Sequence, residues 1–217
     1  MKENLPIMKI ALLTALTGDN YSWQSKLTNP YKSAYCQKRG YDYIYIEYKN
    51  SPLGRHPFWD RIEYLGRHLE HYDYMMWLDA DAAPVNHDKQ IETIVSDGKD
   101  FYISQETTHG TPYFNVGSFI IRKSEWSFGL LKHWKSSEVY SVFGKNGNPE
   151  QDALTDLYKK NWNDCRDHIK VLGRNEINSI GVGCAHTWKP GDFVKHLACQ
   201  KNRQRFEEEW KRNLPPL

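Results

Sequence analysis

The sequence lacks a long apolar run, an excess of charge of one sign and a closely spaced pair of cysteines. No window approaches the roughly 18 consecutive apolar residues that cross a bilayer, and residues 1–8 hold no apolar stretch of signal-peptide length. With 29 basic and 27 acidic residues the net charge is +2, which removes the electrostatic basis for binding nucleic-acid phosphates. The sequence therefore predicts a soluble, cytoplasmic protein with no nucleic-acid partner and no membrane span, unless the chain is a fragment of a longer protein.

The four cysteines are scattered at positions 36, 165, 184 and 199, without a C-x-x-C motif. A chain of 217 residues, 39% of them hydrophobic, forms a sizeable core without disulfides, so we expect reduced thiols. No internal repeat, low-complexity tract or linker divides the sequence. We therefore expect a single domain over residues 1–217.

Apolar periodicity and turn residues predict strands that alternate with helices. The expected strands cover 7–16, 41–48, 74–78, 101–104, 114–122 and 193–198. The expected helices cover 30–39, 58–71, 149–159 and 202–212, with two more that begin at Asp88 and after a cap at Ser124, and a loop-rich stretch over 173–183. This alternation predicts an α/β fold, a mostly parallel central sheet flanked by helices, with ligands at the carboxyl ends of its strands.

An acidic pair, Asp79 and Asp81, directly follows the apolar strand expected at 74–78. Residues two apart in an extended chain point to the same side, so both carboxylates can converge on one ligand. A hard divalent cation would relieve their mutual repulsion and accept their oxygens. A solvated turn, favoured by the nearby Pro84 and Asn86, explains the same pattern, so both interpretations stay open here.

A second polar cluster, Glu150-Gln151-Asp152, occupies the first turn of the helix expected at 149–159. Acidic residues there complement the helix dipole and need no ligand. The amide between them has no such explanation, and these groups could instead face a bound sugar.

Three basic or imidazole side chains could each bind a ligand or have an ordinary structural or solvated role. His196 lies in the strand expected at 193–198 and is either structural or a nitrogen ligand that, with Asp79 and Asp81, would suit Mn²⁺ better than Ca²⁺. Lys201 and Arg61 either contact a diphosphate or are ordinary charged side chains.

Taken together, these stretches resemble a GT-A-fold (Rossmann-like) glycosyltransferase, and glycosyltransferase family 34 in particular, whose members transfer galactosyl, xylosyl or mannosyl groups. The matching stretches, in order, are 31–36 with Gly40 and Tyr41, 58–62, 77–82, 114–122, 150–153 and 193–196. They extend over nearly the whole chain. A soluble chain of this length is also similar to the compact glycosyltransferases encoded by chlorella viruses.

The resemblance implies a metal-dependent, retaining enzyme that moves a hexose-type sugar from a UDP-sugar to a glycan or another hydroxyl acceptor. Asp79, Asp81 and His196 would hold Mn²⁺ or Mg²⁺. Gln151, flanked by Glu150 and Asp152, would lie beside the anomeric carbon as the catalytic group. The residues expected to contact the nucleotide sugar are Thr14, Ala15, Leu16, Tyr21, Arg61, Asp79, Ala80, Asp81, Asn115, Gly117, Cys199 and Lys201.

Aromatic residues make up 14% of the chain, enough for a large core or for a surface that stacks on flat or sugar-like ligands. The order of the motifs favours Trp59 and Trp77 as core residues beside the metal strand. It places Tyr21 and Tyr113 near the nucleotide or sugar.

The sequence departs from the family at Cys199, where glycine is usual, and a side chain there could crowd the diphosphate. Two other functions stay open. A sugar-nucleotide nucleotidyltransferase would share the architecture, although its Gly-rich phosphate loop is represented here by a single glycine, Gly18. A non-catalytic carbohydrate-binding domain would need only the aromatic residues, and would leave Asp79, Asp81 and His196 without a role.

Overall fold

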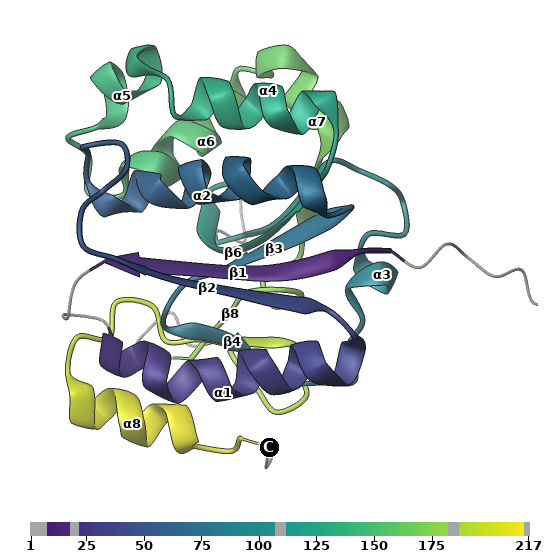
Figure 1. Cartoon of the computed structure of the whole chain (residues 1–217), viewed down its shortest axis with the longest axis vertical. Helices are drawn as coiled ribbons and strands as arrows, with labels where there is room; N and C mark the ends of the chain where they lie inside the picture. The colour runs from purple at the N-terminus through teal and green to yellow at the C-terminus, as the bar shows by residue number, and fades with distance from the viewer. Residues whose placement is uncertain (1–7, 18–21, 107–111, 182–186, 215–217) are drawn as a thin grey trace, which may run out of the picture.

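The structure is a computed structural model that describes residues 8–17, 22–106, 112–181 and 187–214. Its centre is a six-stranded sheet with the order β2-β1-β3-β6-β5-β7 (Figure 1). The strands are β1 (Ile10–Thr17), β2 (Asp42–Tyr48), β3 (Tyr74–Leu78), β5 (Phe101–Gln105), β6 (Phe114–Arg122) and β7 (Ile169–Leu172). Only β6 runs against its neighbours in this sheet, so the predicted α/β fold with a mostly parallel sheet is confirmed.

Helices cover both faces of this sheet (Figure 1). One face carries α2 (Asp60–His68), α4 (Glu125–Trp134), α5 (Ser137–Phe143), α6 (Pro149–Lys159) and α7 (Cys165–His168). The other side carries α1 (Ser22–Arg39) and α8 (Arg203–Lys211), and the short α3 (Ile91–Ile94) lies near one end of the strands. The 3₁₀ turns are η1 (Pro57–Trp59), η2 (Leu69–His71) and η3 (Trp162–Asp164). None of the helices in the described ranges is long and apolar enough to cross a membrane.

A second, three-stranded sheet, which the sequence did not predict, has the order β4-β9-β8. It consists of β4 (Ala82–Pro84), β9 (Val194–His196) and β8 (Ser179–Ile180). The antiparallel register of the first two strands pairs Ala82 with His196. This pairing brings the chain that follows the acidic pair next to a strand from the far end of the sequence.

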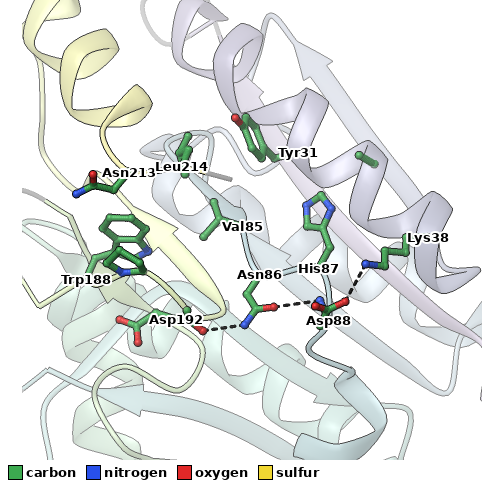
Figure 2. Close-up of a pocket in the computed structure, with 13 residues that line it drawn as sticks. Tyr31, Lys38, Val85, Asn86, His87, Asp88, Trp188, Asp192, Asn213 and Leu214 are labelled. Atoms are coloured by element: carbon green, nitrogen blue, oxygen red, sulfur yellow. Dashed lines mark hydrogen bonds and ion pairs between the residues drawn. The ribbon is translucent and has the colours of Figure 1, made fainter. Parts of the chain in front are cut away.

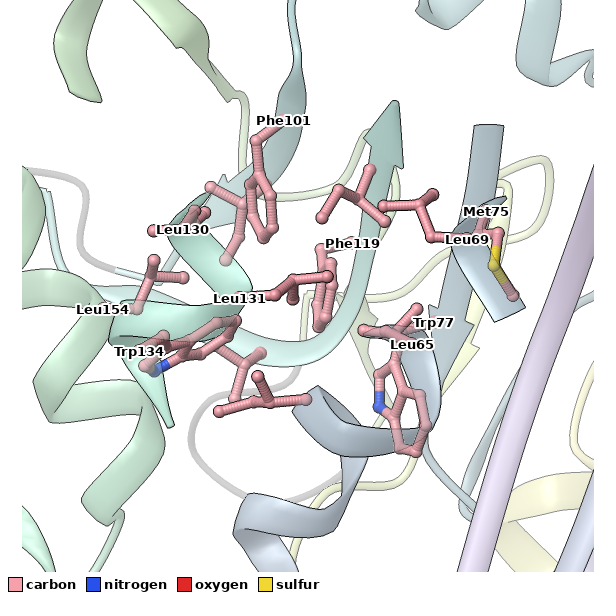
Figure 3. Close-up of a cluster of buried hydrophobic side chains, with 14 of the residues drawn as sticks. Leu65, Leu69, Met75, Trp77, Phe101, Phe119, Leu130, Leu131, Trp134 and Leu154 are labelled. Carbon is pink, nitrogen blue, oxygen red and sulfur yellow. The ribbon is translucent and has the colours of Figure 1, made fainter. Parts of the chain in front are cut away.

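The main core fills the space between the central sheet and the helices of the α2 and α4 side (Figure 3). Phe101 and Phe119 stack at 4.9 Å between ring centroids, and Trp134 packs beside them. Trp59 and Trp77 are buried in the same cluster, which confirms their expected place in the core. The described cysteines, at positions 36, 165 and 199, are free thiols, as expected, whereas Cys184 lies outside the described residues.

The first helix is longer than the sequence predicted, because α1 begins at Ser22 and contains Pro30 rather than starting there. Proline inside a helix removes one backbone hydrogen bond and strains the preceding turn. Contacts made by the first half of the helix offset this cost, including an edge-on contact between Trp23 and Phe206 and a hydrogen bond from the Thr28 hydroxyl to the Ala80 carbonyl. Asn29, the residue before Pro30, lies inside the helix, and its side chain accepts a hydrogen bond from the Tyr43 hydroxyl.

Other predicted boundaries are close to the structure. Ser124 caps α4 by accepting a hydrogen bond from the Ser127 backbone, as expected. The helix expected at Asp88 begins only at Ile91, because the Asp88 backbone bonds to the Asn86 side chain and closes a turn instead. The stretch over 173–183, expected to be loop, includes β8.

Candidate active site

The acidic pair lies at the carboxyl end of β3, where strand and helix residues hold Asp79 in place. One of its carboxylate oxygens, Oδ1, accepts a hydrogen bond from the Trp77 indole at 2.7 Å and is 3.2 Å from the Arg61 guanidinium. The Asp79 backbone N–H donates to the Gly117 carbonyl at 2.9 Å. The carboxylate is therefore directed by fixed neighbours rather than hydrated in a free turn.

His196 completes the cluster through the pairing of β4 with β9. One ligand atom from each of Asp79, Asp81 and His196 lies within 4.8 Å of the others. The His196 Nε2 atom is 3.2 Å from Oδ1 of Asp81. Burial acts to lower the pKa of His196, but the charge and hydrogen bond of Asp81 and the charge of Asp79 together raise that pKa above its usual value. Burial likewise acts to raise the pKa of Asp81, but His196, a backbone hydrogen bond and the charge of Lys32 together lower that pKa.

Amide side chains behind the imidazole determine its orientation. The Asn178 amide donates to Asn115 at 2.9 Å, and its carbonyl oxygen is 2.8 Å from Nδ1 of His196. This arrangement assigns the proton to Nδ1 and directs Nε2 toward the acidic pair, as in metal-binding histidines. Asn178 was not predicted from the sequence, since it lies in a stretch expected to be loop.

Gly117 makes room for this imidazole. A Cβ atom built on Gly117 would be 2.3 Å from Cε1 of His196, which is far inside contact distance. Residue 117 has to be glycine for the ring to approach the strand end so closely.

The donor set fits a divalent metal. It combines two carboxylates with one imidazole. The Nδ1 atom of that imidazole is hydrogen bonded to Asn178, and its Nε2 atom faces the acidic pair. Mixed oxygen and nitrogen ligands suit Mn²⁺ and related ions better than Ca²⁺, which prefers oxygen alone.

Arg61 and Glu150 form a buried ion pair next to this cluster. The guanidinium of Arg61 lies 3.4 Å from Oε1 of Glu150 and also donates to the Val116 carbonyl at 2.6 Å. The other oxygen of Glu150 has no hydrogen-bond partner among the described residues. Burial raises the pKa of Glu150 to about 7, although Arg61 acts against the shift. Glu150 is therefore not the solvated first-turn acid that the helix dipole alone would explain.

Gln151 and Asp152 are also held by partners. The Gln151 side-chain oxygen accepts from the Val116 backbone at 3.2 Å, which links α6 to β6. The two oxygens of Asp152 accept from the Tyr113 hydroxyl and the Asn146 amide, both at 2.8 Å. Tyr113 thus lies beside the predicted catalytic segment, on the side of Asp152.

Lys32, which no motif in the sequence indicates as a site residue, lies beneath the acidic pair. Its side chain is fully buried, and its ammonium donates to the Asp79 carbonyl at 2.9 Å and to the Thr14 hydroxyl at 3.0 Å. Burial lowers the pKa of Lys32 to about 7, although the carboxylates of Asp81 and Asp79 act in the opposite direction. The sequence offers no signal for this role, because a lysine in a polar helix is usually solvated.

The remaining predicted contacts are distributed around the cluster. The Thr14 hydroxyl is engaged with Lys32 and with the Leu78 carbonyl, and Leu16 is buried on the same strand. Cys199 and Lys201 are exposed on the segment that follows β9. The other members are Ala15 on β1, Ala80 between the two acids, and Asn115 on β6, whereas Tyr21 lies outside the described residues.

A groove of about 850 Å³ lies apart from this cluster, beyond the other end of β4 (Figure 2). Its polar groups mostly bond to one another: Lys38 pairs with Asp88, and the Asn86 amide donates to the Gly191 carbonyl. Among the described residues that line it, none belongs to the acidic pair or to the groups around it.

The sequence matches one family model and is similar to a yeast mannosyltransferase. The matching family model is described as "Protein of unknown function, DUF273" and covers residues 32–155. The probable alpha-1,6-mannosyltransferase MNN10 of Saccharomyces cerevisiae is 25% identical in an alignment 213 positions long that covers 77% of this chain and 53% of the relative. This chain therefore spans about half the length of that relative.

Solved structures give the same fold. A glycosyltransferase involved in glycosylation of the major capsid of PBCV-1 superimposes with a TM-score of 0.70, at 17% identity over 93% of this chain and 98% of that one. The galactosyltransferase LgtC, solved with donor and acceptor sugar analogues, has a TM-score of 0.60 at 16% identity, with 97% of each chain covered. Mouse xyloside xylosyltransferase 1 has a TM-score of 0.57 at 10% identity and covers 91% of this chain and 100% of its own.

At these identities the structural likeness establishes the fold, and the expected GT-A fold is confirmed. The family model matches more than half of the sequence. The chain therefore belongs to the DUF273 family.

Proposed function

We propose that this protein is a metal-dependent, retaining glycosyltransferase that moves a hexose-type sugar from a UDP-sugar to a hydroxyl acceptor. The observation that carries the proposal is the cluster of Asp79, Asp81 and His196 at the carboxyl end of β3. Ligands of open α/β sheets bind at this edge. The relative named as a mannosyltransferase and the neighbours named as galactosyl- and xylosyltransferases support the same reaction class.

Asp79, Asp81 and His196 would hold the metal. When bound, a divalent ion supplies positive charge where the negative charge of the diphosphate leaving group grows. Arg61 keeps the Asp79 carboxylate in place, and Lys201, on the exposed segment after β9, adds a positive charge for the diphosphate.

The groups at the start of α6 would act on the sugar. The Gln151 side-chain oxygen accepts one hydrogen bond, from the Val116 backbone, and its second lone pair would face the substrate. A neutral amide is a weak nucleophile, and we assign the partial negative charge of its oxygen to stabilise positive charge at the anomeric carbon. If a covalent intermediate forms, Asp152 and Glu150 are the carboxylates that can attack.

No carboxylate is required to activate the acceptor. In a retaining reaction on one face of the sugar, the departing phosphate oxygen can take the proton of the attacking hydroxyl. The chain then has to orient donor and acceptor and to exclude water from the bond that breaks.

Calorimetry of UDP with Mn²⁺ tests the site, with GDP as a second nucleotide. We expect the folded Asp81→Asn variant to lose at least 10-fold in affinity for UDP with Mn²⁺. The matched control is Asp88→Asn, an exposed acid paired with Lys38, which should bind like the wild type. Unchanged binding by Asp81→Asn would refute the metal assignment.

Hydrolysis of UDP-sugars distinguishes the reaction classes. A transferase releases UDP slowly to water when Mn²⁺ is present. A nucleotidyltransferase instead releases or consumes pyrophosphate, and a carbohydrate-binding domain releases neither product.

A further inference from the structure

Helix α1 faces the candidate site with a polar stripe, formed by Gln24, Thr28 and Lys32. These residues are spaced four apart, so they lie on one side of the helix. All three side chains are almost completely buried, with exposed fractions of 3%, 0% and 0%. A buried polar row on a helix is costly unless each member has a hydrogen-bond partner.

Each member of the stripe donates to a backbone carbonyl of the site. Lys32 donates to the Asp79 carbonyl at 2.9 Å, and the Thr28 hydroxyl donates to the Ala80 carbonyl at 2.7 Å. The Gln24 amide donates to the Gln200 carbonyl at 3.2 Å. The first two bonds hold the turn that carries both acids, and the third holds the segment between Cys199 and Lys201.

The two segments held by the stripe are also joined to each other. The Leu197 backbone donates to the Asp81 carbonyl at 3.0 Å, directly after β9 ends at His196. The acidic turn and the segment that follows His196 are therefore both hydrogen bonded to the same side of α1. The stripe contacts main chain, so it can fix the position of the segments without occupying the ligand atoms.

We propose that Gln24, Thr28 and Lys32 are positioning residues that hold the acidic turn and the segment after His196 in one fixed relation. The proposal rests on the proposed function for its metal readout. It also makes a claim about the backbone that does not depend on a metal: the turn 79–82 and the segment 197–200 open to solvent less often because α1 binds their carbonyls.

Thr28→Val is the central test, because valine has the shape of threonine and lacks the hydroxyl. The matched control is Ser25→Ala, on the same helix, where the buried serine hydroxyl bonds to no group within the part of the chain that the structure describes. Thr28→Ser, which restores a hydroxyl, is the rescue variant. Lys32→Met extends the test to the second carbonyl of the turn.

Two measurements are made on variants whose folding is established by circular dichroism. Amide hydrogen exchange at 79–82 and 197–200 should become at least 10-fold faster in Thr28→Val, and should stay within 2-fold of wild type in Ser25→Ala and Thr28→Ser. Affinity for UDP with Mn²⁺ should fall at least 5-fold in Thr28→Val and at least 10-fold in Lys32→Met, with both controls again within 2-fold.

The two measurements separate the two proposals. Unchanged exchange in Thr28→Val overturns the positioning role, whatever binds at the site, and it does so even if Lys32→Met fails to fold. If exchange is faster in Thr28→Val but the wild type does not bind UDP with Mn²⁺, the positioning role is supported and the proposed metal site is refuted. Faster exchange with unchanged affinity limits the stripe to stability and overturns its role in the site.

Discussion

The imidazole of His196 occupies the space beside Gly117 that any other residue would fill with its own side chain. The Cε1 atom is 2.3 Å from the position of a Cβ on Gly117, and Nδ1 is 3.0 Å from it. Strand β9 can therefore bring His196 this close to strand β6 only because residue 117 has no side chain. The position of one candidate metal ligand therefore depends on a glycine from another sheet.

Gly117→Ala should displace His196 and weaken binding of UDP with Mn²⁺ by at least 10-fold. Overpacking of this kind typically costs about 1–3 kcal/mol of stability. The matched control is Gly129→Ala in α4, where an added Cβ meets no described atom within 4 Å and alanine should raise stability by about 0.5–1 kcal/mol. Calorimetry and urea unfolding give both quantities, and normal binding by Gly117→Ala would show that His196 is not needed in this position.

Glu150→Gln should flatten the dependence of stability on pH. The pKa of Glu150 is raised from 4.5 to about 7 by burial, with Arg61 acting against the shift, so the folded protein keeps a proton that the unfolded chain releases. Protonated Glu150 makes its full contribution to the free energy of unfolding below about pH 4.5, and this contribution is lost as pH rises through about 7. Above that range the variant should be more stable than wild type by up to about 3 kcal/mol. Urea unfolding from pH 4.5 to 8 measures this, and parallel curves for the two proteins would contradict it.

Gln151→Ala should lower turnover much more than donor affinity. Removing one preorganised polar group from a site of charge development typically costs about 100-fold or more in kcat. Binding of UDP with Mn²⁺ should change little, because Gln151 bonds to the Val116 backbone and not to the acidic pair. Steady-state kinetics beside calorimetry separate the two effects. Equal losses in both would make Gln151 a binding residue.

Cys199→Gly should stabilise the protein, because Cys199 has a φ of +62°, in the left-handed region. This conformation costs a residue with a Cβ about 1–2 kcal/mol, and glycine adopts it freely. Cys199→Ala removes the thiol but keeps the Cβ, so it should not show the gain. Thermal unfolding of the three proteins decides, and equal melting temperatures for the glycine and alanine variants would be inconsistent with backbone strain.

Local patterns were sufficient to predict the strands of the central sheet that lie next to the site. Strand β3 and strand β6 have the predicted ends, because each is an apolar run bounded by charged or turn residues. The helix that opens at Pro149 is also as predicted, since proline at a first helical position is a local signal.

Features that depend on contacts between distant segments could not be predicted in this way. Strand β4 is a three-residue piece whose pairing with β9 decides that it is a strand at all. The extension of α1 to the N-terminal side of Pro30 depends on contacts with α8 and with the acidic turn, which outweigh the local signal of Pro30. Lys32 and Asn178 have their places only because partners far along the chain bury them.

The same distance along the chain decides when the candidate site can form. Asp79 and Asp81 precede His196 by more than a hundred residues, and the register that pairs Ala82 with His196 is what joins them. During synthesis from the N-terminus the ribosome will have released β3 and the acidic turn long before β9 exists. The nascent chain therefore carries the acidic pair before its imidazole partner exists, and a product that ends before residue 196 could complete its central sheet and still lack that partner.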